Sequence, residues 1–137
     1  MSKKILDEVK FIALLMGVIF GLSALLSVIT AQEYITSDNF HSKTAKGITV
    51  VEFYASWNGA NAVDYLEELK SCNVYRVDIV KHSGIQKENK VTSIPTIIIY
   101  SNGVEEIRFN PNIMMHLDAT RKEVQSAIDE IVFNKFQ

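Results

Sequence analysis

Cys72 is the single cysteine of this 137-residue chain and carries its most reactive type of side chain. One cysteine cannot cycle between a dithiol and an internal disulfide, so sulfur chemistry is limited to an intermolecular disulfide or a lone thiol. An isolated cysteine is more often a small, partly buried side chain than a nucleophile. We therefore expect no dithiol-disulfide chemistry from this chain alone.

The other residues capable of chemistry are not grouped. His41, His82 and His116 lie far apart in the sequence, without the carboxylate or cysteine spacing of a metal site. There is no glycine-rich phosphate loop and no G-x-S-x-G motif. The net charge is −2, and no basic stripe is interleaved with aromatic residues. We predict no metal, no cofactor, no small-molecule substrate and no nucleic-acid partner.

Strand patterns follow one another from residue 48 onward. Runs rich in β-branched and aromatic residues predict four strands, at residues 48–55, 74–80, 96–100 and 104–109. The Asn102-Gly103 pair between the last two runs is a strong hairpin signal. The last two strands should therefore be antiparallel.

Helical patterns lie between and around these strands. A short helix is expected at residues 37–46, a second behind a cap at Asn61 over residues 62–69, and a third at residues 83–90. Thr120 and Glu123 have the spacing of a capping box, and an apolar stripe with helical periodicity follows them as far as residue 132. The strands and helices together predict an α/β domain.

Three segments resemble the thioredoxin family, which includes the domains of protein disulfide isomerases. Residues 51–57 (VEFYASW) resemble the strand that leads into the family's active site, and residues 91–96 (VTSIPT) resemble its cis-proline segment. Asn102-Gly103 resembles its hairpin turn. The resemblance covers residues 33–132 and implies a three-layer α/β sandwich with a mixed central sheet, which we place at residues 33–137.

The same resemblance implies that the family's chemistry is lost. The family's motif is Trp-Cys-x-x-Cys, and here the corresponding residues are Trp57, Asn58, Gly59, Ala60 and Asn61. An amide is not a nucleophile toward sulfur and forms no disulfide, so we expect that the chain is not an enzyme. Glu52 aligns with the family's buried acid, for which we expect a structural role, with a raised pKa or a basic partner.

Binding can survive the loss of chemistry. In the family, the backbone before the cis-proline receives an extended peptide, which implies a groove beside Trp57, Ile94 and Pro95. A longer loop stands at residues 110–117 (NPNIMMHL), where the family has a short glycine-containing one. Its apolar side chains either fold back onto the sheet or present an adaptable surface to a partner; they are Ile113, Met114 and Met115.

Residues 11–31 contain no charged side chain and are mostly apolar. A helix of this length, at about 1.5 Å per residue, matches a hydrocarbon core of roughly 30 Å. We therefore predict a transmembrane helix at 11–31 behind a short tail at 1–10. A cleaved signal peptide is the alternative, although the apolar run exceeds the usual length of about 7–15 residues and Asp7 and Glu8 precede it.

Two features of the N-terminal region bear on orientation and partners. Lysines in the tail place the N-terminus on the cytoplasmic side and the domain on the periplasmic, lumenal or exterior side. Ala13, Gly17 and Gly21 recur every four residues, which either marks a face for a second helix or reflects the usual small-residue content of membrane helices.

Three functions fit these patterns. The first is a redox-inactive, membrane-anchored subunit that binds other membrane or membrane-associated proteins of a larger assembly. The second is a non-catalytic, chaperone-like domain that binds unfolded peptides. The third, an enzyme that uses Cys72 as a lone thiol, has the least support.

Overall fold

The computed structural model describes residues 3, 8, 10 and 33–136. The predicted transmembrane helix at 11–31, with the small residues Ala13, Gly17 and Gly21, lies outside the described residues. Within the described residues, no helix combines the length and the hydrophobicity that a membrane crossing requires. The account below therefore concerns residues 33–136.

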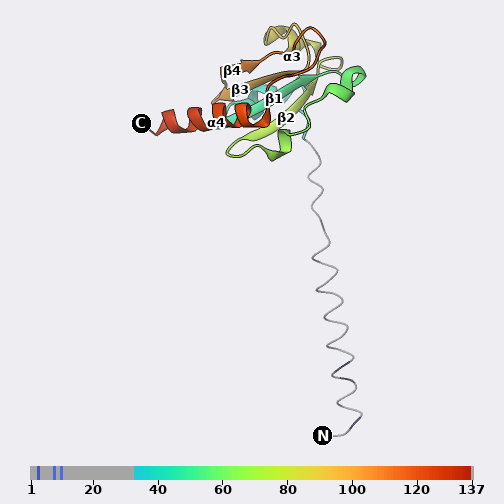
Figure 1. Ribbon diagram of the computed structural model, residues 1–137, viewed down its shortest axis with the longest axis vertical. Helices are drawn as coiled ribbons and strands as arrows, with labels where there is room; N and C mark the ends of the chain where they lie inside the picture. The colour runs from blue at the N-terminus through green and yellow to red at the C-terminus, as the bar shows by residue number, and fades with distance from the viewer. Residues whose placement is uncertain (1–2, 4–7, 9, 11–32, 137) are drawn as a thin grey trace. The chain divides into compact units, whose positions relative to one another are not determined.

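A mixed four-stranded sheet forms the centre of the domain (Figure 1). The strands are β1 (Ile48–Tyr54), β2 (Asn73–Asp78), β3 (Thr96–Ser101) and β4 (Val104–Phe109), in the spatial order β2-β1-β3-β4. β1 runs parallel to β2 and antiparallel to β3, and β3 is antiparallel to β4. Tyr34 extends the β2 edge through one parallel bridge to Arg76. All four predicted strands are present.

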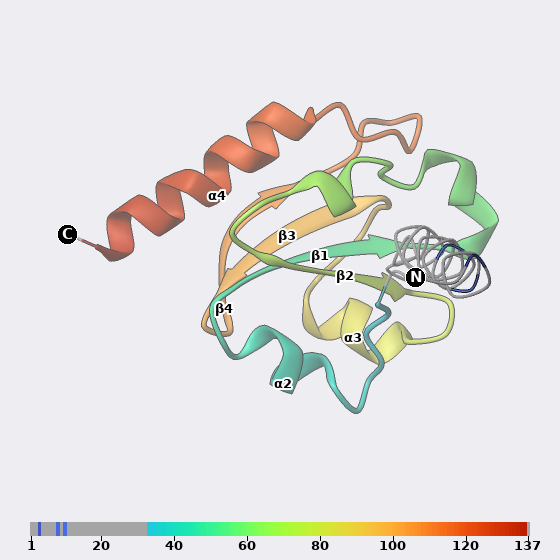
Figure 2. The same cartoon turned by 90° about the horizontal axis from the view of Figure 1, so that it is seen from below.

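Helices cover both faces of this sheet, as Figure 2 shows. α2 (Phe40–Thr44) and α3 (Ser83–Glu88) lie on one side, and α4 (Arg121–Lys135) lies on the other. Side chains alternate along β1, so that Val51 and Phe53 pack toward α2 and α3 while Ile48 and Val50 pack toward α4. The predicted thioredoxin-like α/β architecture with a mixed sheet is confirmed.

Local sequence signals explain where α4 begins and where the chain turns between β3 and β4. Thr120 caps α4 in a capping box: its Oγ1 accepts the Glu123 N–H at 3.3 Å, and a Glu123 carboxylate oxygen accepts the Thr120 N–H at 2.7 Å. The hairpin between β3 and β4 turns through Asn102 and Gly103, which have φ values of 50° and 83°. Both features were predicted, because each depends on residues close together in the sequence.

The prediction of a helix at 62–69 is wrong. The chain forms two short 3-10 turns instead, η1 (Ser56–Asn61) and η2 (Leu66–Glu68), and Ala62 between them is extended. The Val63 N–H donates to Glu52 at 2.7 Å, and the Val63 carbonyl accepts a hydrogen bond from Arg76. A helix over residues 62–69 would use the Val63 carbonyl in its own hydrogen-bond ladder, so the bond from Arg76 competes with the helix. The bond from the Val63 N–H to Glu52 adds to the stability of the break.

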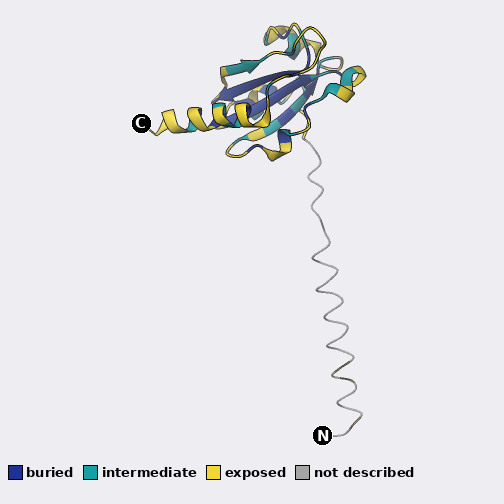
Figure 3. Ribbon diagram, in the orientation of Figure 1, coloured by how far each residue is buried: buried dark blue, intermediate teal, exposed yellow. Residues whose placement is uncertain are grey.

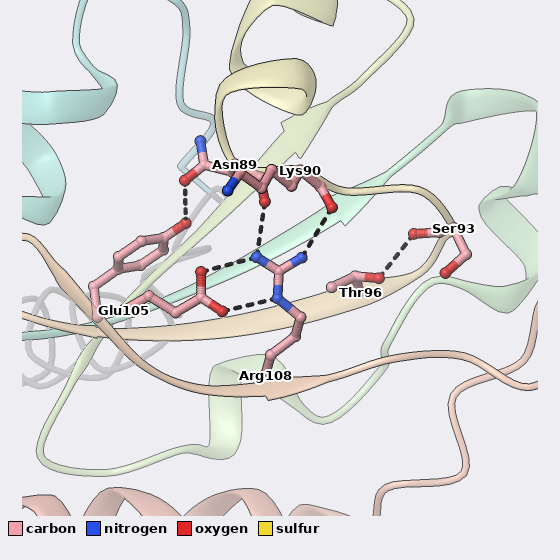
Figure 4. Close-up of polar contacts among 7 residues, drawn as sticks. Asn89, Lys90, Ser93, Thr96, Glu105 and Arg108 are labelled. Carbon is pink, nitrogen blue, oxygen red and sulfur yellow. Dashed lines mark hydrogen bonds and ion pairs between the residues drawn. The ribbon is translucent and has the colours of Figure 1, made fainter.

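A polar cluster fixes the connection from α3 into β3 (Figure 4). Arg108 donates two hydrogen bonds of 2.8 Å to Glu105 and one of 2.7 Å to the Asn89 carbonyl. A further bond of 3.3 Å reaches the Lys90 carbonyl, and the Tyr100 hydroxyl donates to the Asn89 side chain at 2.7 Å. The Arg108 cluster thereby holds the start of the segment that leads to Ile94 and Pro95.

Candidate functional site

The turn after β1 carries the residues that replace the family's reactive motif. It starts where the Asn58 N–H donates to the Ala55 carbonyl at 2.9 Å, and it ends where the Ala62 N–H donates to Gly59 at 3.1 Å. Trp57 is 65% exposed, and Gly59 and Ala60 are also exposed. The turn therefore presents an aromatic side chain to solvent.

Asn58 and Asn61 contact one another. The Asn61 side-chain amide donates to the Asn58 side-chain oxygen at 3.0 Å. The Asn58 amide in turn donates a long hydrogen bond of 3.4 Å to the Met115 carbonyl. A neutral amide pair therefore stands where a dithiol would act, and it links the turn to the loop before α4.

Glu52 lies fully buried in β1, in contact with the backbone beyond the Asn pair. One carboxylate oxygen accepts the Val63 N–H at 2.7 Å and the other accepts from Arg76 Nε at 2.5 Å. Burial raises the pKa of Glu52 above its ordinary value, although the Val63 N–H and Arg76 act in the opposite direction. Both of these hydrogen bonds join the carboxylate to neighbouring structural groups, and neither involves the Asn pair.

Arg76 is the residue at this site that sequence reasoning missed. It lies in β2, opposite Glu52 in the register of β1 and β2. The sequence contained one signal for it, because an arginine among the apolar residues of a predicted core strand needs a partner. The signal did not say which acid that partner would be.

Ile94 and Pro95 are buried, and the peptide bond between them is cis. Both residues therefore present little surface to a partner, whereas Thr92 just before them is exposed. The Thr96 hydroxyl fixes the segment by donating to the Ser93 carbonyl at 2.8 Å (Figure 4). This cis bond is the one that the resemblance implied for the segment.

The loop before α4 turns its apolar side chains to solvent. Asn112 organises it, because its side-chain oxygen accepts the N–H groups of Met114 at 2.9 Å and His116 at 3.2 Å. Ile113 and Met114 are 102% and 79% exposed, and Met115 is 44% exposed. Of the two alternatives for this loop, the structure shows the exposed one. Phe133 on α4 and Phe136 directly after it are exposed as well.

A pocket of about 370 Å³ opens beside Asn61, at the extended segment between η1 and η2. Its walls come from residues 60–65 and 116–120. Two of its lining residues are joined by a hydrogen bond of 2.5 Å, which the Tyr65 hydroxyl donates to the Ala119 carbonyl. Within the described part of the chain, no three His, Cys, Asp or Glu side chains group as a metal site, here or elsewhere.

The three histidines occupy separate places. His41 lies 3.2 Å from Glu88, and His82 contacts the Ser37 hydroxyl at 3.2 Å. His116 lies 3.6 Å from Asp118 on the rim of the pocket. The structure does not bring these side chains together.

Cys72 lies apart from the turn, half-buried against the core on the α4 side. Burial raises the pKa of its thiol to about 11, so little thiolate forms at neutral pH. We expect native Cys72 to react with iodoacetamide at neutral pH about tenfold or more slowly than in the urea-unfolded chain. Equal iodoacetamide reaction rates in the folded and the unfolded chain would instead support the hypothesis that Cys72 acts as a lone catalytic thiol.

The family model described as Thioredoxin matches residues 31–125. Among curated proteins, the thioredoxin of Chlamydia caviae is 31% identical over 77 residues, which cover 52% of this chain and 76% of that protein. Thioredoxin-1 of Saccharomyces cerevisiae is 28% identical over 80 residues, covering 53% of this chain and 78% of the yeast protein.

Solved structures with the same fold include thioredoxins from two distant organisms. A mutant thioredoxin from Halobacterium salinarum has a TM-score of 0.59 at 16% identity, covering 74% of this chain and 94% of that one. A mutant thioredoxin from Entamoeba histolytica has a TM-score of 0.57 at 24% identity, covering 73% and 99%. At these identities the likeness concerns the fold.

Proposed function

The chain belongs to the thioredoxin family, and from this premise we propose that it is a redox-inactive, membrane-anchored interaction subunit of a larger membrane-associated assembly. Its domain binds a partner protein and catalyses no reaction. Residues 11–31 serve as the anchor, with the domain on the exported side of the membrane.

The observation that carries this proposal is the hydrogen bond between Asn58 and Asn61, beside an exposed tryptophan. The amide pair leaves no nucleophile, while the fold around it is kept. Glu52 is held by Val63 and Arg76, so it is committed to structure. A retained scaffold without its reactive groups supports binding as the remaining role.

The partner-binding surface that we propose combines the turn and the loop. Asn58 reaches the Met115 carbonyl, which brings the loop next to the turn that carries Trp57. An exposed aromatic side chain beside flexible thioethers is typical of adaptable protein-binding surfaces. We call this set the Trp57 surface; it consists of Trp57, Ile113, Met114 and Met115.

A double variant, Trp57→Ala with Met115→Ser, tests this surface. The full chain is extracted from its native membrane in mild detergent, and co-purifying proteins are identified. We expect the double variant to recover the partner at least about tenfold less well, because truncation of a central aromatic anchor costs about 2 kcal/mol or more. Val104→Ala is the matched control, since Val104 is similarly exposed, at 62%, but lies on β4.

Two results would contradict the proposal. Recovery of the wild-type chain as a monomer, with no membrane protein attached, removes the assembly role. Crosslinks from position 57 to many unrelated chains would instead favour the chaperone-like alternative. The intact mass decides between an anchor and a cleaved signal peptide, because a chain that retains residues 1–31 has a mass of 15.4 kDa.

A further inference from the structure

The outward side of α4 is a second surface, separate from the Trp57 surface. Val124, Ile128 and Ile131 pack inward on the sheet. Residues half a helical turn away point to solvent, and in Figure 3 this side of the helix is exposed along its length. We call it the α4 outer face; it consists of Lys122, Ser126, Glu130 and Phe133.

Two hollows border this face. One, of about 540 Å³, lies between α4 and the edge strand β4, where Ile107 and Phe109 are half-buried. The other, of about 310 Å³, is bounded by side chains of α4 alone. Ser126 lines both, so the small residue at the middle of the face leaves room for a second helix to approach.

The charges on this face are arranged symmetrically about Ser126. Lys122 lies one turn before it and Glu130 one turn after it. Three other charges nearby already have polar partners: Arg121 pairs with Glu68 at 3.3 Å, Glu123 belongs to the capping box, and Asp129 accepts a hydrogen bond from Gln125 at 2.9 Å. In the described part of the chain, Lys122 and Glu130 form no ion pair with a neighbour.

Phe133 extends the face toward the C-terminal end of the helix. It is 62% exposed, and in Figures 1 and 2 this end of α4 projects beyond the strands. Among the described residues, Phe133 belongs to neither of the two buried clusters of the domain. It can be covered by another protein surface.

We propose that the α4 outer face binds the same face of a second copy of this chain, with the two helices antiparallel about a two-fold axis at Ser126. Lys122 of each copy then faces Glu130 of the other copy. The projecting Phe133 packs over the first turn of the other copy's helix, near the half-buried Ala119. In this symmetric contact, all four residues of the α4 outer face touch the other copy.

Charge decides the direction of the two helices. A parallel pair would place Lys122 against Lys122 and Glu130 against Glu130, which is repulsive. The antiparallel pair converts both contacts into attraction. Because the two-fold contact is closed, it gives a dimer rather than a filament.

A charge exchange tests this arrangement on the full chain in detergent micelles. Lys122→Glu or Glu130→Lys alone places like charges opposite one another twice in each dimer, and we expect each to weaken dimerisation about tenfold at low salt. The double exchange restores both attractions and should recover wild-type dimerisation. Sedimentation equilibrium at several protein concentrations measures the dimer fraction.

Recovery in the double variant separates an intermolecular contact from an effect on the monomer. Positions 122 and 130 are two turns apart on one helix, so within a single chain neither charge compensates for the other. Additive losses in the double variant would overturn the proposal. Retained dimer in every variant would also overturn it and would assign association to another segment, such as residues 11–31.

A crosslink tests the position of the axis. In a Cys72→Ser background, Ser126→Cys places a thiol on the two-fold axis, where two helices in contact bring the Cα atoms within disulfide range. We expect a covalent dimer on mild oxidation. Lys87→Cys on α3 is the matched exposed control and should remain monomeric.

Phe133→Ala should lower the dimer fraction further, while Trp57→Ala, which is similarly exposed at 65%, should leave it unchanged. Failure of the Ser126 crosslink, or capture of a different protein on this face, would overturn the second copy as occupant. Since Trp57→Ala tests the proposed partner site, the two proposals can fail independently.

Discussion

Replacing Arg76 with methionine lowers the free energy of unfolding by about 3–5 kcal/mol at neutral pH, because a fully buried carboxylate loses its counter-ion. Glu52 has no exposed surface, and its side chain is held by Arg76 and by the Val63 N–H. Methionine keeps most of the apolar stem of arginine. The measured loss therefore reports the missing charge and hydrogen bonds, including the bond to the Val63 carbonyl.

The Arg76→Met defect should depend on pH in a defined direction. Burial raises the pKa of Glu52 above its ordinary value of 4.5 in the folded chain. A carboxyl with a raised pKa stabilises the fold while it is protonated, below its unfolded-state pKa, and this contribution is lost as pH rises through the folded-state pKa. Because Arg76 opposes the rise, removing it raises the pKa further. The defect should thus be smallest near about pH 4 and grow toward neutrality.

Urea unfolding of the full chain in detergent, followed by circular dichroism at several pH values, measures this effect. Arg121→Met is the matched control, since Arg121 pairs with Glu68 on the surface, where both side chains are more than half exposed. It should cost less than about 1 kcal/mol at any pH. Adding Glu52→Gln to Arg76→Met should recover much of the loss, because a neutral amide replaces the buried charge. A defect of equal size in both arginine variants would refute the buried pair.

Restoring cysteine at positions 58 and 61, in a Cys72→Ser background, should produce an internal disulfide and a measurable turnover of disulfide substrates. The wild-type chain should show none. The two amides are within 3.0 Å of one another, so thiols on these residues can meet. The change alters only two side chains of the turn. Because the wild-type chain has no thiol there, we expect disulfide turnover to change from none to a measurable rate.

The restored thiol should nevertheless be a poor nucleophile. A reactive cysteine of this type owes its low pKa to the N-terminus of a helix, and here the chain leaves its short turn at Ala62. We expect the thiol at position 58 to titrate within about one unit of 8.5, the ordinary cysteine value. Ultraviolet thiolate absorbance measures that pKa, and reduction of insulin measures turnover.

Single-cysteine variants at position 58 or 61 are the controls for this experiment. Each should form mixed disulfides without turnover, because no second thiol resolves them. Turnover by the wild-type chain would contradict the redox-inactive reading. A thiol pKa below about 7 in the restored protein would show that the short turn is sufficient to activate a cysteine.

Local patterns made much of the fold predictable. The hairpin depends on two adjacent residues with positive φ, and the start of α4 depends on Thr120 and Glu123, three residues apart. The strands follow from runs of β-branched residues. In each case the residues that decide the conformation are neighbours in the chain, so the sequence displays the cause directly.

The segment at 62–69 was not predictable in this way. Its apolar spacing suits a helix, but Glu52 and Arg76 occupy the backbone groups of Val63 from 11 and 13 positions away in the sequence. A local pattern contains no information about such competition. The missed helix and the missed role of Arg76 therefore have the same origin.

By itself the sequence determined that the family's two cysteines are replaced, because the identity of Asn58 and Asn61 and the count of one cysteine need no coordinates. The tertiary structure decided the rest of the site. It joined the two asparagines, placed the Met115 carbonyl beside them, and buried Glu52 against Arg76. These contacts join residues from β1, β2 and two separate loops, and an interaction between distant segments exists only after the chain has folded.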